Sequence, residues 1–298
     1  MSVVPANIES ESLAIGSAEH RRLLGQFFLD THVEYLPEQM HWPALAEEEL
    51  GRLRSLPFWQ EAVSTENVTS NTVAAAAALE SDPLVRRAIE LQGFEEMRHA
   101  RLLVALTSHY RIPIDSPPRF TPRSLESDFL FAGFGECFDS FFAFGLFALA
   151  RESGFFPPAL VKVFEPVMQE EARHILFFVN WVKYRRSQLA WWRRPAFRLR
   201  CAWIILKQVA SRVKTARSMG KPQPASAGAS ASASASENFT LTAHQELGAQ
   251  VTLHRLLELG LTENERRMAE YDARLKRPRL VPGIARALFQ VIPGRARN

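Results

Sequence analysis

The sequence predicts an all-α protein, a four-helix bundle of two antiparallel hairpins with additional N- and C-terminal helices. Four long stretches carry apolar residues at helical spacing, and short and long connections alternate between them. Patterns typical of strands are almost absent. The chain has 298 residues, of which 47% are hydrophobic, so it can bury a substantial core.

The N-terminal part, residues 1–56, is expected to be a tail followed by short helices. Helical spacing begins near Ser17 and fades at Leu36-Pro37. A second short helix is expected from Pro43 to Arg54.

The central part, residues 57–183, is expected to form the bundle. Proline suits the first turn of a helix, so Ser81-Asp82-Pro83 indicates the end of one helix and the start of the next. A proline-rich stretch from Pro113 to Pro122 is expected to cross between the hairpins. The four helices are expected at residues 57–80, 83–110, 125–153 and 157–183.

The third of these helices is long and apolar enough, over residues 129–150, to suggest a transmembrane segment. Glu136 and Asp139 near its centre argue against a membrane span. We therefore expect a helix that is apolar all round because other helices surround it.

The chain changes character after the bundle. We expect a basic helix at residues 184–220, a low-complexity linker at 221–237 and a C-terminal helical segment at 238–298. The C-terminal helices are expected at residues 241–259, 262–275 and 282–291.

Positive charge is concentrated in one segment. No Asp or Glu occurs between Glu171 and Glu237, whereas residues 183–217 contain eleven basic residues. Tryptophans beside arginines suit a peripheral contact with an anionic membrane or an acidic partner protein. A solvated helix packed on the bundle is the simpler alternative, and the absence of a recognised nucleic-acid-binding motif makes nucleic acid an unlikely partner.

One pentapeptide pattern occurs twice, as Glu95-Glu96-Met97-Arg98-His99 and Glu170-Glu171-Ala172-Arg173-His174. Each copy lies in the second helix of its hairpin, and residues three apart on a helix share one face. Each copy therefore directs a carboxylate and an imidazole to one point. The Glu-x-x-His spacing alone is weak evidence for a metal site, because Glu38 and His41 have the same spacing outside any long helix. The duplication carries the prediction of a metal site.

These motifs resemble the ferritin-like di-iron carboxylate superfamily, in which two Glu-x-x-His helices and one Glu from each of two other helices bind two metal ions. The acid-Glu-x-Arg-His pattern is most similar to the branch of the superfamily that contains bacterial multicomponent monooxygenases, ribonucleotide reductase small subunits and soluble acyl-carrier desaturases. That branch usually has Asp where this chain has Glu95 and Glu170. The resemblance covers about residues 57–183.

The resemblance implies one further carboxylate from each of the other two helices. Glu66 and Glu61 compete in the first helix, and Glu66 is favoured because it lies level with Glu96 across the turn. Glu136 is the only mid-helix glutamate of the third helix, with Asp139 as its rival.

We expect Glu96 and Glu171 to bridge two metal ions and His99 and His174 to bind one ion each. Glu66 and Glu136 would be terminal ligands. Four carboxylates and two imidazoles suit two iron ions, with manganese as a substitute for one or both, better than zinc. Arg98 and Arg173 would either pair with Glu170 and Glu95 or point outward.

The resemblance implies that such a centre activates O2. The leading hypothesis is a di-iron oxidase or monooxygenase of a small, fairly apolar substrate, with an electron donor protein as a further partner. Phenylalanines and glycines around Glu136 could leave an apolar pocket for that substrate. The alternatives are a non-haem iron-binding, peroxide-detoxifying protein and a helical interaction module with a vestigial metal site.

A cytoplasmic location is expected from two features. The first residues lack the basic start and apolar run of a signal peptide. The two cysteines, Cys137 and Cys201, fit a reducing compartment.

Overall fold

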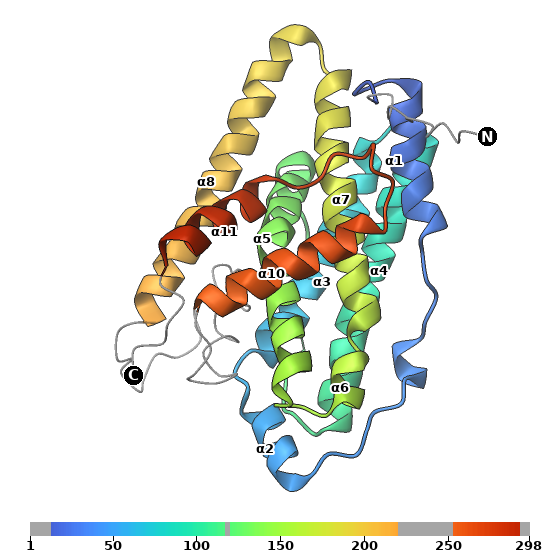
Figure 1. Ribbon diagram of the computed structural model, residues 1–298. Coiled ribbons are helices and arrows are strands. Elements are labelled where there is room, and N and C mark those ends of the chain that lie inside the picture. Colours follow the sequence, from blue (N-terminus) through green and yellow to red (C-terminus); the bar gives the residue numbers. More distant parts are fainter. Residues whose placement is uncertain (1–12, 117–119, 220–252, 293–298) are drawn as a thin grey trace, which may run out of the picture.

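The computed structural model describes residues 13–116, 120–219 and 253–292 (Figure 1). Within these ranges all regular structure is helical and no strand occurs. The all-α prediction is therefore confirmed. The expected linker at 221–237 and residues 241–252 of the expected C-terminal helices lie outside the described part of the chain.

The N-terminal region runs along the outside of the long helices. Helix α1 spans Ala18–Asp30, and the Ser17 hydroxyl caps it by accepting from the His20 N–H at 3.0 Å. The helix ends at Asp30 instead of Leu36, and a non-helical stretch leads from there to a short 3-10 turn, Pro37–Gln39. Helix α2, Glu47–Ser55, begins four residues later than expected.

The helices expected in the central part of the chain lie side by side (Figure 1). Asp82 caps the second of them through the Leu84 and Val85 N–H groups, at 3.0 and 3.2 Å, and Pro83 fills its first turn. Helix α4 packs along α3, and α5 contacts both α3 and α7. The four helices are α3 (Trp59–Ala76), α4 (Pro83–His109), α5 (Leu125–Ser153) and α7 (Glu165–Gln188).

The fourth helix is interrupted, which corrects the expected continuous helix at 157–183. A short helix α6, Pro158–Lys162, comes first, and α7 begins at Glu165 with Pro166 in its first turn. Proline lacks the N–H that would continue a helix from the preceding turn, so the chain starts a new helix there.

Helix α5 passes the length and composition test for a membrane span, but in this structure it is a core helix. It contacts α3, α7, α8 and α10, and Phe129, Phe141 and Phe144 on it are buried. The expectation of a helix surrounded by other helices is met.

Two further helices pack on α5 from the C-terminal part of the chain. Helix α8 spans Arg194–Met219 after a 3-10 turn at Trp191–Arg193, and α10 spans Leu253–Ala269. The expected break between residues 259 and 262 is absent, because α10 continues through it. Helix α11, Leu280–Val291, follows and contacts both α10 and α5.

The glycines of α5 admit neighbouring helices, and do not open the pocket that we expected. A Cβ on Gly133 would lie 2.2 Å from the Phe178 ring, and one on Gly145 would lie 2.8 Å from the Leu256 carbonyl oxygen of α10. The small residues are therefore explained by close helix packing.

Replacing Gly145 with alanine is expected to destabilise the protein by about 1–3 kcal/mol, because the new methyl group would push against α10 backbone. Gly51→Ala is the matched control, since its added methyl would meet nothing within 4 Å. Urea denaturation of both variants measures the difference. Equal stability of the two variants would contradict the close α5–α10 contact.

Candidate metal centre

Two buried histidines direct the same ring nitrogen into one cluster between α4 and α7. His99 Nδ1 lies 3.2 Å from Glu171 Oε1, and His174 Nδ1 lies 2.8 Å from Glu96 Oε1. The ligand atoms of these four buried residues all lie within 4.8 Å of one another. The two pentapeptides thus come together as the duplication predicts, and the cluster could hold a metal ion.

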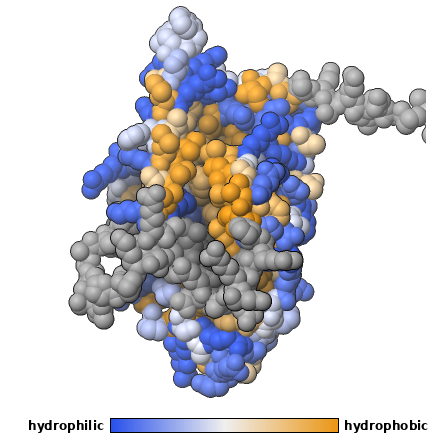
Figure 2. All heavy atoms as spheres, turned by 60° about the vertical axis from the view of Figure 1, so that its left-hand side comes forward, coloured by the Kyte–Doolittle hydropathy of each residue, from blue (hydrophilic) through white to orange (hydrophobic). Residues whose placement is uncertain are grey.

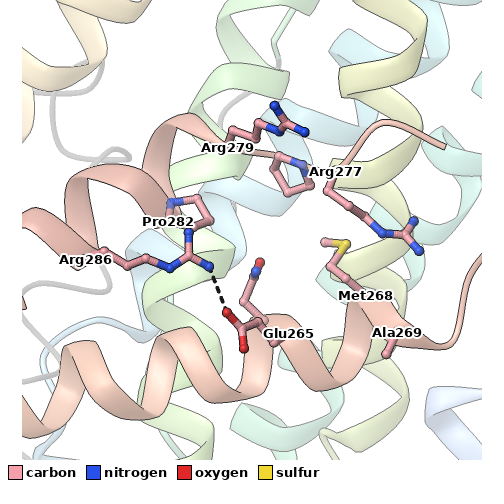
Figure 3. A pocket seen from close by; sticks show the side chains of 9 residues that line it. Glu265, Met268, Ala269, Arg277, Arg279, Pro282 and Arg286 are labelled. Atoms are coloured by element: carbon pink, nitrogen blue, oxygen red, sulfur yellow. Dashed lines mark hydrogen bonds and ion pairs between the residues drawn. The ribbon is translucent and has the colours of Figure 1, made fainter. Parts of the chain in front are cut away.

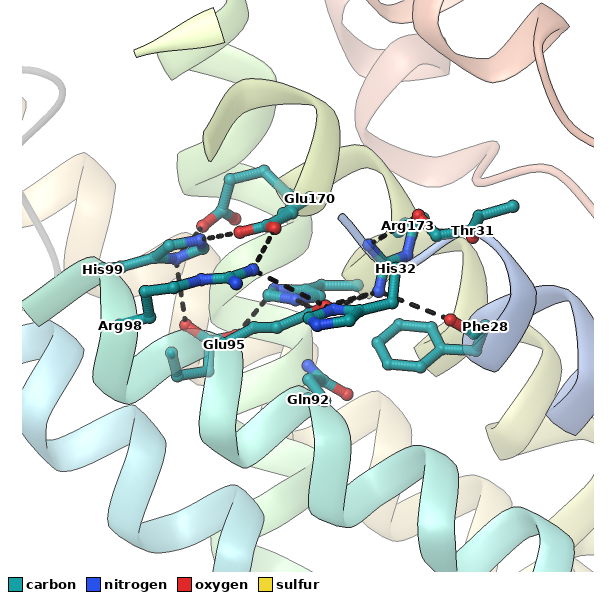
Figure 4. Close-up of polar contacts among 12 residues, drawn as sticks. Phe28, Thr31, His32, Gln92, Glu95, Arg98, His99, Glu170 and Arg173 are labelled. Carbon is teal, nitrogen blue, oxygen red and sulfur yellow. Dashed lines mark hydrogen bonds and ion pairs between the residues drawn. The ribbon is translucent and has the colours of Figure 1, made fainter. Parts of the chain in front are cut away.

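The other ring nitrogen of each histidine is held by the first acid of the opposite pentapeptide (Figure 4). His99 Nε2 lies 2.8 Å from Glu170 Oε2, and His174 Nε2 lies 2.9 Å from Glu95 Oε2. A carboxylate on Nε2 orients the ring and leaves Nδ1 for a metal.

Both arginines of the motif are buried and pair between α4 and α7, which is one of the two arrangements considered for them. Arg173 donates to both oxygens of Glu95, at 2.7 and 2.9 Å, and Arg98 donates to Glu170. Burial opposes ionisation of Glu95, but its hydrogen bond with His174 and the charges of His174 and Arg173 lower its pKa to about 2. The alternative of outward-pointing arginines is therefore wrong.

Glu66 lies at the rim of the cluster, with its Oε2 atom 3.7 Å from His99 Nδ1 and its side chain 24% exposed. Burial of its carboxyl raises the pKa to about 7, although His99 opposes the shift, and Glu96 and Glu171 add to it. The structure brings Glu66 to the cluster, at the level that the count of residues from the turn predicts.

Glu136 faces the cluster from α5. Its Oε2 atom accepts from Gln92 at 3.4 Å. Burial, reinforced by the nearby carboxylates of Glu96 and Glu171, raises the pKa of Glu136 well above its ordinary value. Its rival Asp139 forms an ion pair of 2.6 Å with Arg212 of α8.

The cluster contains polar atoms that other described residues do not satisfy. His99 Nδ1, His174 Nδ1, Glu96 Oε1 and Glu136 Oε1 are buried without a hydrogen-bond partner in the described part of the chain. The close approach of His174 Nδ1 to Glu96 Oε1 is an ion-pair distance without hydrogen-bond geometry. Buried polar atoms are almost always paired, so this group of lone pairs fits a bound cation.

The charges of the clustered Glu and His side chains also suit a bound cation. Burial opposes ionisation of Glu96, yet His174 and His99 hold its pKa well below the ordinary range. Burial opposes protonation of the two histidines, yet the surrounding carboxylates raise the pKa of both well above its ordinary value, so protonated imidazoles compensate part of the charge and a bound cation would take their place.

Four residues around the centre were missed by sequence reasoning. Ser140 donates to Glu171 Oε2 at 2.6 Å, and Tyr35 donates to Glu170 Oε2 at 3.1 Å. His32 contacts Glu95, and Gln92 contacts Glu136. Gln92 and Ser140 lie one helical turn from Glu96 and Glu136, so spacing could have identified them. His32 and Tyr35 lie where the sequence predicts helix, and no local signal marks them.

One pocket lies away from this centre, between α10 and α11 (Figure 3). It measures about 330 Å³ and is lined by Arg277, Arg279 and Arg286 among others. None of the predicted site residues lines it.

The structure thus combines an all-helical fold with a buried Glu/His cluster that is compatible with a ferritin-like metal site. A scan against family models, a search of curated proteins and a search of solved structures each found no match to this chain.

Proposed function

We propose that this chain is a ferritin-like di-iron oxidoreductase that uses O2 to oxidise a small, fairly apolar organic molecule. One observation carries the proposal. Two buried imidazoles point unpartnered Nδ1 atoms at the same carboxylates, while their Nε2 atoms are held by Glu95 and Glu170. The Nδ1 atoms lie at ion-pair distance from Glu96 and Glu171 but make no hydrogen bond, which suits ligand atoms around a cation.

The proposed ligands are the six residues that the sequence indicates. His99 and His174 would supply the two imidazole ligands, and Glu96 and Glu171 would supply carboxylates from the same two helices. Four carboxylates neutralise two divalent cations, and an oxygen-rich set with two imidazoles suits iron or manganese. The terminal ligands would be Glu66 and Glu136.

Ferrous iron, when bound, supplies electrons for the reduction of O2. The remaining tasks belong to the chain. Arg98 and Arg173 hold the acids that orient the histidines. The buried phenylalanines of α5 keep bulk water from the centre.

Access is proposed at the Glu66 side of the cluster. The Glu66 side chain is partly exposed, whereas His99 is buried beside it. Because the glycines of α5 are filled by neighbouring side chains, the room for a substrate is small. A small substrate that approaches along α3 fits this arrangement.

Anaerobic loading with Fe(II), followed by mixing with O2, tests the proposal. We expect two iron ions per chain to be oxidised, faster by O2 than by hydrogen peroxide. Glu136→Ala should slow the oxidation at least tenfold, since one iron would lose a ligand. Asp139→Asn, one turn away and paired with Arg212, should leave the rate unchanged.

Two results would favour the other functions. Faster oxidation by hydrogen peroxide than by O2 would indicate a peroxide-removing iron protein. A chain that binds no iron in iron-rich medium would be an interaction module.

A further inference from the structure

Helix α8 carries two apolar rows on opposite sides. Phe197, Cys201 and Ile204 are buried against the core. Leu199, Trp203, Leu206 and Val213 are 42–72% exposed. At 100° per residue, the exposed row is centred roughly opposite the buried one, so the core cannot account for it.

Helix α11 repeats this arrangement beside it. Val281 and Ala285 are buried, while Leu280, Ile284 and Leu288 are exposed. Val291, at the end of the same helix, is 81% exposed. Single exposed apolar residues are common, but two rows on neighbouring helices are not explained by chance exposure.

Both rows lie on one side of the molecule. Helices α8 and α11 both contact α5. Figure 2 turns this side forward and shows apolar residues gathered over it. We call it the α8–α11 face. It consists of Leu199, Trp203, Leu206, Val213, Leu280, Ile284, Leu288 and Val291.

The face belongs to the two acid-free parts of the chain. No Asp or Glu occurs between residues 172 and 236, and none follows Asp272. Exposed cations flank the α8 row, and Lys207 lies 5.5 Å from the centre of the Trp203 ring. Arg279, directly before α11, adds a further exposed cation, whereas Arg286 is paired with Glu265. The other flanking cations are Arg193, Arg198 and Lys214.

We infer that the α8–α11 face binds an anionic membrane surface. Exposed tryptophans and leucines beside arginines and lysines are typical of helices that lie at the level of lipid headgroups. The exposed rows of two helices together present a broad apolar area. Such an area fits a flat membrane surface better than it fits a single partner helix.

A second copy of this chain fits the α8–α11 face less well than an anionic membrane does. Lys207 and Lys214 lie seven residues apart along one edge of the α8 row, whereas Arg200, earlier on the same edge, is paired with Glu126 of α5. An antiparallel pair of α8 helices would bring these edges together, and the helix offers no acid to compensate them.

Vesicle sedimentation with the full-length, metal-loaded protein tests this inference. We expect binding to vesicles of phosphatidylcholine with phosphatidylglycerol to be at least tenfold stronger than to phosphatidylcholine alone. Binding should weaken as salt is raised, because salt screens exposed charges. Lys207→Glu/Lys214→Glu should reduce it at least tenfold.

Apolar variants provide the matched comparison. Trp203→Gln/Leu206→Gln should weaken vesicle binding at least tenfold, because the apolar contact with the acyl chains is lost. Val33→Gln/Val104→Gln replaces exposed residues outside the face and should leave binding unchanged. Circular dichroism and iron content should be the same for all four proteins, since every replaced side chain is exposed.

Four outcomes would overturn the inference. They are equal binding to neutral and anionic vesicles, no vesicle binding at all, binding that is insensitive to salt, and binding that survives the Trp203/Leu206 change. A dimer that the same change dissociates, without vesicle binding, would assign the face to a second copy. Hydroxyl-radical labelling of Trp203 as low as that of buried Trp181, again without vesicle binding, would show that the chain itself covers the face.

Discussion

Replacing Glu96 and Glu171 together with alanine is expected to abolish binding of both iron ions. These two acids come from the two pentapeptides and lie nearest to the histidine Nδ1 atoms, at 2.8 Å and 3.2 Å. Without them the remaining set would be two imidazoles and two acids on different helices, too few to hold two iron ions. Elemental analysis of the purified proteins measures the change, from two iron ions per chain to none.

Glu38→Ala/Glu90→Ala is the matched control for this experiment. Glu38 shares the Glu-x-x-His spacing with His41, but it forms a surface pair with Arg101, and Glu90 is exposed on α4. The control should keep two iron ions. Metal retained by the Glu96/Glu171 variant, or lost from the control, would place the metal elsewhere.

Replacing Arg173 with methionine is expected to destabilise the protein by about 3–5 kcal/mol. The change would remove the guanidinium that donates to both oxygens of the buried Glu95 carboxylate and leave the carboxylate with its histidine contacts, and both side chains of the lost pair are at most 2% exposed. Urea denaturation measures the loss. Because Glu95 also holds His174 Nε2, the iron affinity should fall about 10- to 100-fold.

Two further variants isolate the cause. Arg173→Met/Glu95→Gln should be less destabilised than Arg173→Met alone, because the neutral amide leaves no buried charge. Arg255→Met breaks an exposed pair with Glu152 and should cost less than about 1 kcal/mol. A loss at Arg173 as small as that at Arg255 would contradict a buried, charge-compensating role.

Local signals predicted several elements well. The expected helix at 125–153 agrees with α5, because Gly154 ends it in a left-handed conformation, with φ of 64°. Asp82-Pro83 marks the start of α4 through a cap and a proline, both of which act within one turn. The pentapeptides predicted the Glu/His cluster, because helical spacing alone determines which side chains share a face.

Long-range packing decided what these signals could not. The sequence placed residues 31–36 in a helix, whereas the structure uses this stretch to bring Tyr35 to Glu170 and His32 to Glu95. From the sequence, the glycines of α5 could either line a pocket or allow close helix packing. Their neighbours on α7 and α10 show that they allow close packing.

The sequence by itself determined that the chain is helical and that two Glu-Glu-x-Arg-His motifs direct acids and imidazoles to matching levels. Both properties depend on residues within a turn or two of one another. Only the tertiary structure decided that Arg98 and Arg173 cross to Glu170 and Glu95, and that α8 keeps an apolar row outside the core. These features depend on contacts between residues far apart in the chain, whose energies no local pattern records.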